Sequence, residues 1–122
     1  MEEYIGKVKL ILDYYKGEDA YSDGEIEDEI LDIVKNCEGG DYGSIIKERR
    51  KWPILYHLSD LRGNIVKSMP IESTDEILEI GAGCGAVTAA LCGMGKKLDC
   101  VDLSKKRSTI NAYRNIKEYK GV

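Results

Sequence analysis

Three glycines alternate with small residues in one short segment, Gly81-Ala82-Gly83-Cys84-Gly85, and this segment constrains the fold of the 122-residue chain most strongly. The apolar run 77–80 before it is typical of a short buried strand, and the small residues 86–92 after it are typical of a helix. Glycines allow a sharp strand-to-helix turn and let a ligand approach the backbone without a Cβ in the way. A loop of this kind usually receives a nucleotide-like ligand at the helix N-terminus.

A second strand and a further helix are predicted directly after this unit. Residues 98–102 have a strand pattern, and Ser104 is a favourable N-cap. Ile110, Tyr113 and Ile116 then recur at helical spacing. The order strand, glycine loop, helix, strand, helix predicts the α/β class and the opening of a doubly wound parallel sheet.

The first 70 residues are predicted to be mainly helical. Residues 2–15 place Ile5, Val8, Leu12 and Tyr15 at helical spacing, so an amphipathic helix is expected there. Further signals predict a second helix from Asp23 to the glycines at 39–40, a turn or extended stretch at 52–53, and a short helix capped by Ser59 that stops before Pro70.

Charge is distributed unevenly along the chain. Residues 1–40 carry 12 acidic and 4 basic side chains, whereas residues 41–122 carry 10 acidic and 14 basic ones. The acidic run of the second helix is typical of a solvated helix face, although a basic partner could dock there. The basic cluster 47–51 could meet nucleic acid or phosphate, but pairing with the acidic helix would explain both charge blocks and is favoured. The net charge of −4 makes nucleic acid an unexpected partner.

Two carboxylates accompany the glycine loop. Asp102 ends the second strand, 21 positions after Gly81, where an acid can accept hydrogen bonds from both hydroxyls of a ribose. Glu79 lies within the apolar strand, where an unpaired carboxylate would be costly. A cationic group of a ligand, or hydrogen-bond donors from the neighbouring loop, would relieve that cost.

These motifs resemble a known enzyme family. The segment from Glu79 to Gly85 is similar to the first motif of the class I S-adenosylmethionine-dependent methyltransferases, acid-x-Gly-x-Gly-x-Gly, and the segment 101–104 is similar to the second. The resemblance implies a Rossmann-like domain whose first part is residues 71–122, after a helical N-terminal region of residues 1–70. It implies S-adenosylmethionine as the cofactor and methyl transfer as the reaction.

The resemblance also assigns residues to the cofactor. In the family the loop passes under the methionine and ribose, the second acid holds the ribose hydroxyls, and the first acid faces the cationic end. The implied cofactor-binding residues are Glu79, Gly81, Ala82, Gly83, Cys84, Gly85, Asp102 and Leu103. The segment 52–70 is less specifically similar to the lead-in of bacterial methyltransferases found beside glycosyltransferases, which suggests a glycan or small-molecule acceptor.

Two other functions fit parts of the pattern. The segment 81–86 also satisfies the G-x-G-x-x-G/A fingerprint of NAD(P)-dependent oxidoreductases, but a pyrophosphate beside Glu79 would be repelled, so methyl transfer is favoured. The acidic front could instead make the chain a non-catalytic interaction module. Such a module should keep its activity when Asp102 and the glycine loop are changed.

The length limits the expected activity. A complete sheet of the family needs about 200 residues at roughly 30 residues per strand–helix–strand unit, so the chain is expected to end before the third strand and to be inactive alone. No catalytic residue is identified. A two-stranded parallel sheet would leave apolar surface and open edges, so self-association is expected.

The remaining features favour a cytoplasmic protein without a metal. No apolar run reaches a membrane span, and the acidic start does not resemble a signal peptide. The four cysteines form no C-x-x-C pair, so reduced thiols are expected rather than a zinc site or disulfides. Cys84 is expected to pack rather than react. His57, the single histidine, could act as a general base, but a structural role is favoured.

Overall fold

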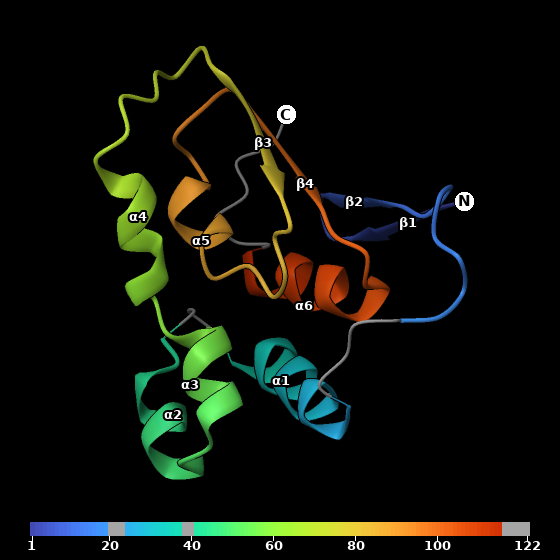
Figure 1. Ribbon diagram of the computed structural model, residues 1–122, viewed down its shortest axis with the longest axis vertical. Helices are drawn as coiled ribbons and strands as arrows, with labels where there is room; N and C mark the ends of the chain where they lie inside the picture. The colour runs from blue at the N-terminus through green and yellow to red at the C-terminus, as the bar shows by residue number, and fades with distance from the viewer. Residues whose placement is uncertain (20–23, 38–40, 116–122) are drawn as a thin grey trace.

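The computed structural model describes residues 1–19, 24–37 and 41–115, and the statements below concern these residues. Figure 1 shows two small sheets and a set of helices. The elements in chain order are β1 (Glu2–Ile5), β2 (Val8–Ile11), α1 (Glu25–Asn36), α2 (Gly43–Arg49), α3 (Trp52–Leu58), the 3₁₀ turn η1 (Leu61–Gly63), α4 (Asn64–Lys67), β3 (Glu76–Ile80), α5 (Thr88–Leu91), β4 (Lys97–Val101) and α6 (Lys105–Asn115).

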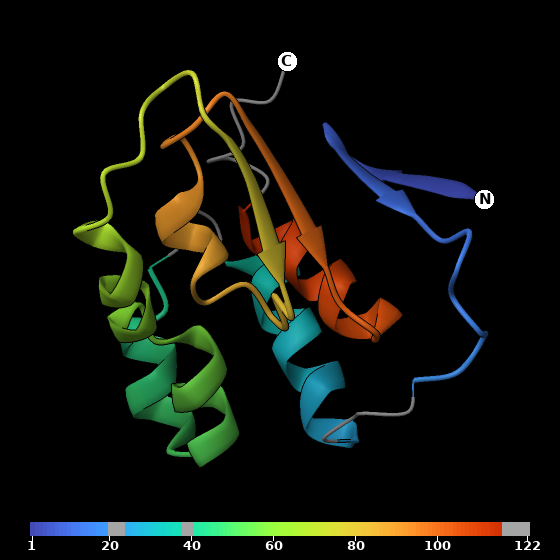
Figure 2. The ribbon, with the colours of Figure 1, turned by 45° about the horizontal axis from the view of Figure 1, so that its top comes forward.

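The α/β unit predicted from the glycine loop is present. Strands β3 and β4 pair in parallel, from Glu76 opposite Lys97 to Ile80 opposite Val101. Their carboxyl ends therefore lie at one edge, where Figures 1 and 2 place the loop after β3 and the start of α6. Helix α5 is shorter than the predicted 86–92 segment. The chain is thus mixed α/β and agrees with a partial Rossmann-like fold.

The predicted helix over residues 2–15 is wrong, because β1 and β2 form an antiparallel hairpin there. Ile5 pairs with Val8 across a two-residue turn whose first position, Gly6, has φ of 58°. That conformation suits glycine and a tight hairpin turn. Isoleucine and valine also favour extended backbone, so the apolar spacing that matched a helix matched a hairpin as well.

The other N-terminal helices differ from expectation mainly at their ends. Helix α1 begins after Gly24 and ends at Asn36; the predicted cap Asp23 and the glycines 39–40 lie outside the described residues. Trp52 and Pro53 begin α3 instead of forming a turn or extended stretch, because proline is tolerated in the first helical turn, where its missing N–H needs no partner. The next helical stretch ends at Lys67, before Pro70, as predicted, but the predicted N-cap Ser59 is the C-cap of α3, and Asp60 precedes η1 without a side-chain cap.

One hydrophobic core joins the two halves of the chain. Ile30 of α1, Ile54 and Leu58 of α3, Cys84 of the glycine loop and Ile110 of α6 belong to the same buried cluster. Residues on both sides of position 70 therefore stabilise each other, and the glycine loop is anchored on the N-terminal helices.

Ion pairs between the acidic front and the basic rear reinforce this core. Glu27, whose side chain is fully buried, accepts a hydrogen bond from Arg107 Nε at 3.0 Å. Glu29 pairs with Arg49 and Lys51 at 2.8 and 2.9 Å, which confirms that this basic cluster lies against the acidic helix. The acidic run is therefore not simply a solvated face.

The prediction that residues 77–80 form a buried strand is wrong for one face of the sheet. Leu78 is 60% exposed and Ile80 is 78% exposed, and Val101 beside them on β4 is also exposed. Parallel sheets normally have both faces covered. Among the described residues, the sheet face that carries Leu78, Ile80 and Val101 is therefore open.

No helix in the part of the chain that the structure describes has both the length and the apolar character of a membrane span.

Candidate functional site

The glycine loop turns the chain sharply at the carboxyl end of β3. Gly81 and Gly83 have φ of 73° and 58°, which side chains rarely adopt, and a Cβ at either position would meet no atom within 4 Å. Gly85 has φ of 87°, but a Cβ there would lie 2.2 Å from Oδ1 of Asn111. The first two glycines thus leave open space for a ligand, whereas the third is required by packing against α6.

Four amides of this loop donate hydrogen bonds within the protein. The N–H groups of Gly81 and Ala82 both donate to Val101 O, at 2.7 and 3.2 Å. Gly83 N–H donates to Asp102, and Gly85 N–H donates to Ala82 O at 3.1 Å. These amides do not form the phosphate cradle expected of a pyrophosphate-binding loop. Helix α5, with four residues, also has little dipole to offer an anion.

Asp102 holds the loop and the next helix together. Its Oδ2 accepts a hydrogen bond from Gly83 N at 2.8 Å, and its Oδ1 accepts one from Ser104 N at 2.9 Å. Ser104 Oγ in turn accepts from Arg107 N at 3.1 Å, which confirms Ser104 as the N-cap of α6. A carboxylate has about four lone-pair positions, so both oxygens of the half-buried Asp102 can accept further hydrogen bonds.

Glu79 receives its hydrogen bonds from the protein. Thr88 Oγ1 donates to Glu79 Oε1, and Cys100 Sγ donates to the same oxygen at 3.5 Å. Asn111 Nδ2 donates to Thr88 Oγ1 at 3.1 Å, and Asn115 Nδ2 donates to Asn111 Oδ1 at 2.7 Å. The sequence left two explanations for this carboxylate, a cationic group of a ligand or donors from the neighbouring loop. The structure supplies donors, but they come from α5 and β4 and not from the loop. Glu79 Oε2 accepts no hydrogen bond from the described residues.

The side chain of Cys84 is buried, whereas that of Leu103 is exposed. Cys84 is buried in the core cluster, and burial raises the pKa of its thiol to about 12, so it packs rather than reacts. A ligand on the loop could meet Cys84 through its backbone alone. Leu103, beside Asp102, is exposed and offers an apolar surface at the same edge.

Sequence reasoning missed the polar residues that support this edge. Thr88, Asn111 and Asn115 are buried and connect α6 to Glu79 through hydrogen bonds. Asn111 and Asn115 are four residues apart on α6, so a pair of amides on one helix face was the available signal. The residues that this face of α6 contacts lie more than 20 positions earlier in the chain, so no local pattern reveals them.

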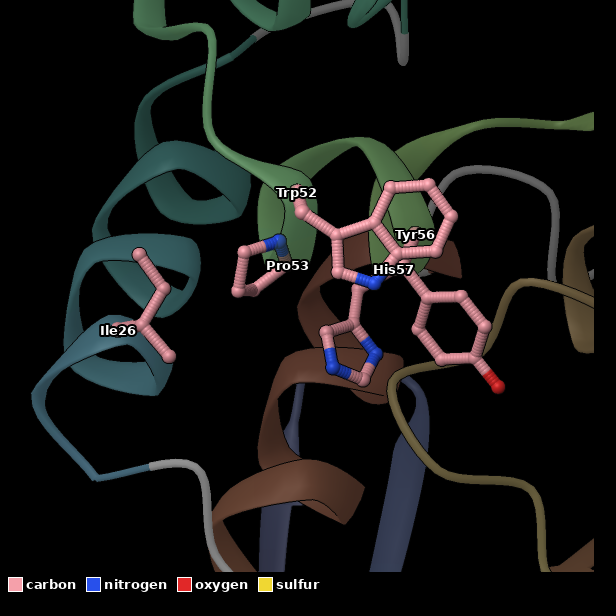
Figure 3. Close-up of a pocket in the computed structure, with 5 residues that line it drawn as sticks. All are labelled: Ile26, Trp52, Pro53, Tyr56 and His57. Carbon is pink, nitrogen blue, oxygen red and sulfur yellow. The ribbon is translucent and has the colours of Figure 1, made fainter.

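A second feature is an aromatic pocket between α1 and α3. Figure 3 shows its lining residues, which are Ile26, Trp52, Pro53, Tyr56 and His57. The side chain of His57 is buried at the pocket, while its backbone oxygen accepts a hydrogen bond from the buried Arg114. No cluster of three or more His, Cys, Asp or Glu side chains suited to a metal occurs among the described residues.

Comparison with known proteins gives one partial similarity. The chain is 36% identical over 61 residues to the ribosomal RNA small subunit methyltransferase A of Fusobacterium nucleatum. The matched protein is a methyltransferase. The similarity covers 48% of this chain and 23% of that protein, so the chain matches about a quarter of its relative. No family model matches the chain, and no solved structure matches it.

The similarity supports methyl transfer as the general kind of function. The similarity agrees with the hydrogen bonds that the loop amides donate within the protein, because amides that are already paired argue against a dinucleotide site. The small-molecule or glycan acceptor gains no support, because the relative's name refers to ribosomal RNA.

Proposed function

We propose that this chain contains the cofactor-binding part of an S-adenosylmethionine-dependent methyltransferase. The observation that carries the proposal is the position of Asp102, which directly follows β4 and accepts a hydrogen bond at 2.8 Å from the backbone N–H of Gly83 in the loop after β3. An acid at this edge, beside a glycine loop that has no phosphate cradle, suits a ribose better than a pyrophosphate. The partial similarity to a methyltransferase supports the same conclusion.

The chemistry of the edge fits each part of this cofactor. The remaining lone pairs of Asp102 suit the two ribose hydroxyls, and the exposed Leu103 suits the adenine ring. Oε2 of Glu79 suits the ammonium group of the methionine part. The open space at Gly81 and Gly83 lets the cofactor lie against the backbone.

The cofactor would supply an electrophilic methyl group on a sulfonium ion. The contribution of this chain is binding and orientation, which lower the barrier to in-line attack by holding the donor in one geometry. Thr88 and Asn111 fix the carboxylate of Glu79, and Ser104 fixes that of Asp102. No catalytic base is assigned, and the activity of the whole protein is part of the proposal because the chain matches about a quarter of its relative.

The test is calorimetric titration of S-adenosylhomocysteine into wild type and Asp102→Ala. Each lost hydrogen bond to a charged acceptor is worth about 1.5–3 kcal/mol, so we expect at least a tenfold loss of affinity. Asp99→Ala is the matched control, because Asp99 lies on β4 just before Asp102 and pairs with Lys97 at 3.2 Å. Binding of NADH in place of S-adenosylhomocysteine would support the oxidoreductase alternative, and binding that Asp102→Ala leaves unchanged would contradict the proposed site.

A further inference from the structure

A carboxylate from the N-terminal segment caps helix α6. Asp19 Oδ1 accepts a hydrogen bond from Lys105 N at 2.9 Å, and Asp19 Oδ2 accepts one from Lys106 N at 3.2 Å. Lys105 and Lys106 are the first two residues of α6, so their amides have no acceptor within the helix itself. In Figure 1 the chain that follows β2 passes the beginning of α6. Asp19 therefore supplies these acceptors from 86 positions earlier in the chain.

The same turn of α6 is bound to Asp102. Ser104 N donates to Asp102 Oδ1 at 2.9 Å, and Ser104 Oγ accepts from Arg107 N at 3.1 Å. Ser104 is 1% exposed, so this turn is packed within the protein. The two carboxylates, Asp19 and Asp102, thus accept hydrogen bonds from the consecutive amides of residues 104, 105 and 106. A displacement of this turn would displace a donor that holds Asp102.

Contacts within the N-terminal segment fix the carboxylate of Asp19. Tyr15 OH donates to Asp19 Oδ1 at 3.0 Å. Partial burial acts to raise the pKa of Asp19, but hydrogen bonds from the Lys105 amide and the Tyr15 hydroxyl outweigh it, and the pKa lies below its ordinary value of 3.8. Lys105 Nζ also pairs with Glu3 of β1 at 3.0 Å. The segment therefore has a second contact with α6 that does not depend on Asp19.

We propose that Asp19 is a positioning residue for the cofactor: by fixing the first turn of α6, it keeps Asp102 in the orientation that binds the ribose hydroxyls. The part that concerns the ribose rests on the proposed function, whereas control of Asp102 by Asp19 does not. Asp19 acts through Ser104 and is assigned no contact with the cofactor. A cap with a merely structural role would stabilise α6 and leave Asp102 unaffected, so the two roles predict different results.

Amide hydrogen exchange, followed for each residue by nuclear magnetic resonance, separates the two roles without a ligand. In Asp19→Ala the first two amides of α6 lose their acceptor under either role. Positioning alone predicts that the amides of Gly83 and Ser104, which donate to Asp102, also exchange about tenfold faster. Unchanged exchange at Gly83 and Ser104 would overturn the proposal.

Control variants show whether the effect belongs to this carboxylate. Asp13→Ala is the matched control, because Asp13 lies in the same segment and pairs with the N-terminal ammonium, so it should leave both amides unchanged. Asp19→Asn keeps one acceptor oxygen and should restore most of the protection, since asparagine caps helices well. If Asp19→Ala does not fold, as judged by circular dichroism, Tyr15→Phe removes a hydrogen bond to Asp19 and should accelerate the same two amides. No acceleration in that variant would then overturn the proposal.

Calorimetric titration of S-adenosylhomocysteine extends the test to the cofactor. Asp19→Ala should weaken binding about fivefold in the wild-type background. The same change should have no further effect in Asp102→Ala, because positioning acts through Asp102. Equal losses in both backgrounds would overturn the proposal. Absence of binding to the wild type would contradict the proposed function alone, and exchange at Gly83 and Ser104 would still decide the role of Asp19.

Discussion

A Cβ atom at Gly85 would lie 2.2 Å from Oδ1 of Asn111, so the third glycine of the loop is fixed by a helix that begins 20 residues later. The same asparagine donates to Thr88, which donates to Glu79. The spacing that resembles a cofactor motif therefore also satisfies a packing requirement. A substitution that disturbs the contact between residue 85 and Asn111 should therefore also affect Glu79, through the two hydrogen bonds that connect Asn111 to it.

Gly85→Ala should destabilise the protein more than Gly93→Ala. The new methyl group clashes with Asn111 and Asn115, and φ of 87° is unfavourable for alanine. We expect a loss of about 2–4 kcal/mol in the free energy of unfolding, from overpacking and backbone strain together. Gly93→Ala is the control, because Gly93 has φ of 85° and open space, so the expected cost is about 1 kcal/mol. Equal urea midpoints for the two variants would contradict the packing role.

The pair formed by Glu27 and Arg107 should be sensitive to removal of one partner. Glu27 is fully buried, so Glu27→Gln removes the buried charge that pairs with Arg107, at a cost of about 3–5 kcal/mol. Asp28→Asn, which breaks the exposed pair with Lys106, should cost less than about 1 kcal/mol. Thermal unfolding of both variants is the measurement. A small effect of Glu27→Gln would mean that the pair does not hold α1 on α6.

Burial of Cys84 should make stability fall at alkaline pH. The pKa of this thiol is raised to about 12 by burial, above its ordinary value of 9.0. The unfolded chain therefore loses this proton first as pH rises, and the contribution to stability is complete below about pH 9 and is lost toward pH 12. Urea unfolding at pH 8 and pH 10 should show a smaller decline for Cys84→Ala than for wild type. Rapid alkylation of native Cys84 at pH 8 would contradict its buried position.

The exposed face of the β3–β4 sheet leads us to predict that the chain self-associates. Leu78, Ile80 and Val101 present apolar surface on a parallel pair, and such surface is favourably buried against another copy of the chain. We expect sedimentation to show a dimer that dissociates on dilution, and Ile80→Lys to shift the balance to monomer. Glu76→Lys at the start of the same strand is the control, since it changes charge without removing apolar area. A wild-type monomer at every concentration would refute the prediction.

Local patterns predicted the α/β unit well. The glycine segment placed β3, β4 and α6 within a few residues, and Ser104 was recognised as the cap of α6. These features depend on residues close in sequence, such as the backbone freedom of Gly81 and the capping oxygen of Ser104. The hairpin at residues 2–11 was missed because its apolar spacing also fits a helix, and pairing between strands decides such cases.

The sequence by itself determined the order of the elements, the position of Asp102 beside the glycine loop, and the match of opposite charges between the two halves. Only the tertiary structure decided which groups satisfy Glu79, why Gly85 must be glycine, and that Glu27 is buried against Arg107. Trp52 and Tyr56 likewise became a pocket only when α1 packed on α3. The physical reason is that these contacts join residues up to 80 positions apart, and burial, not local spacing, selects the partners.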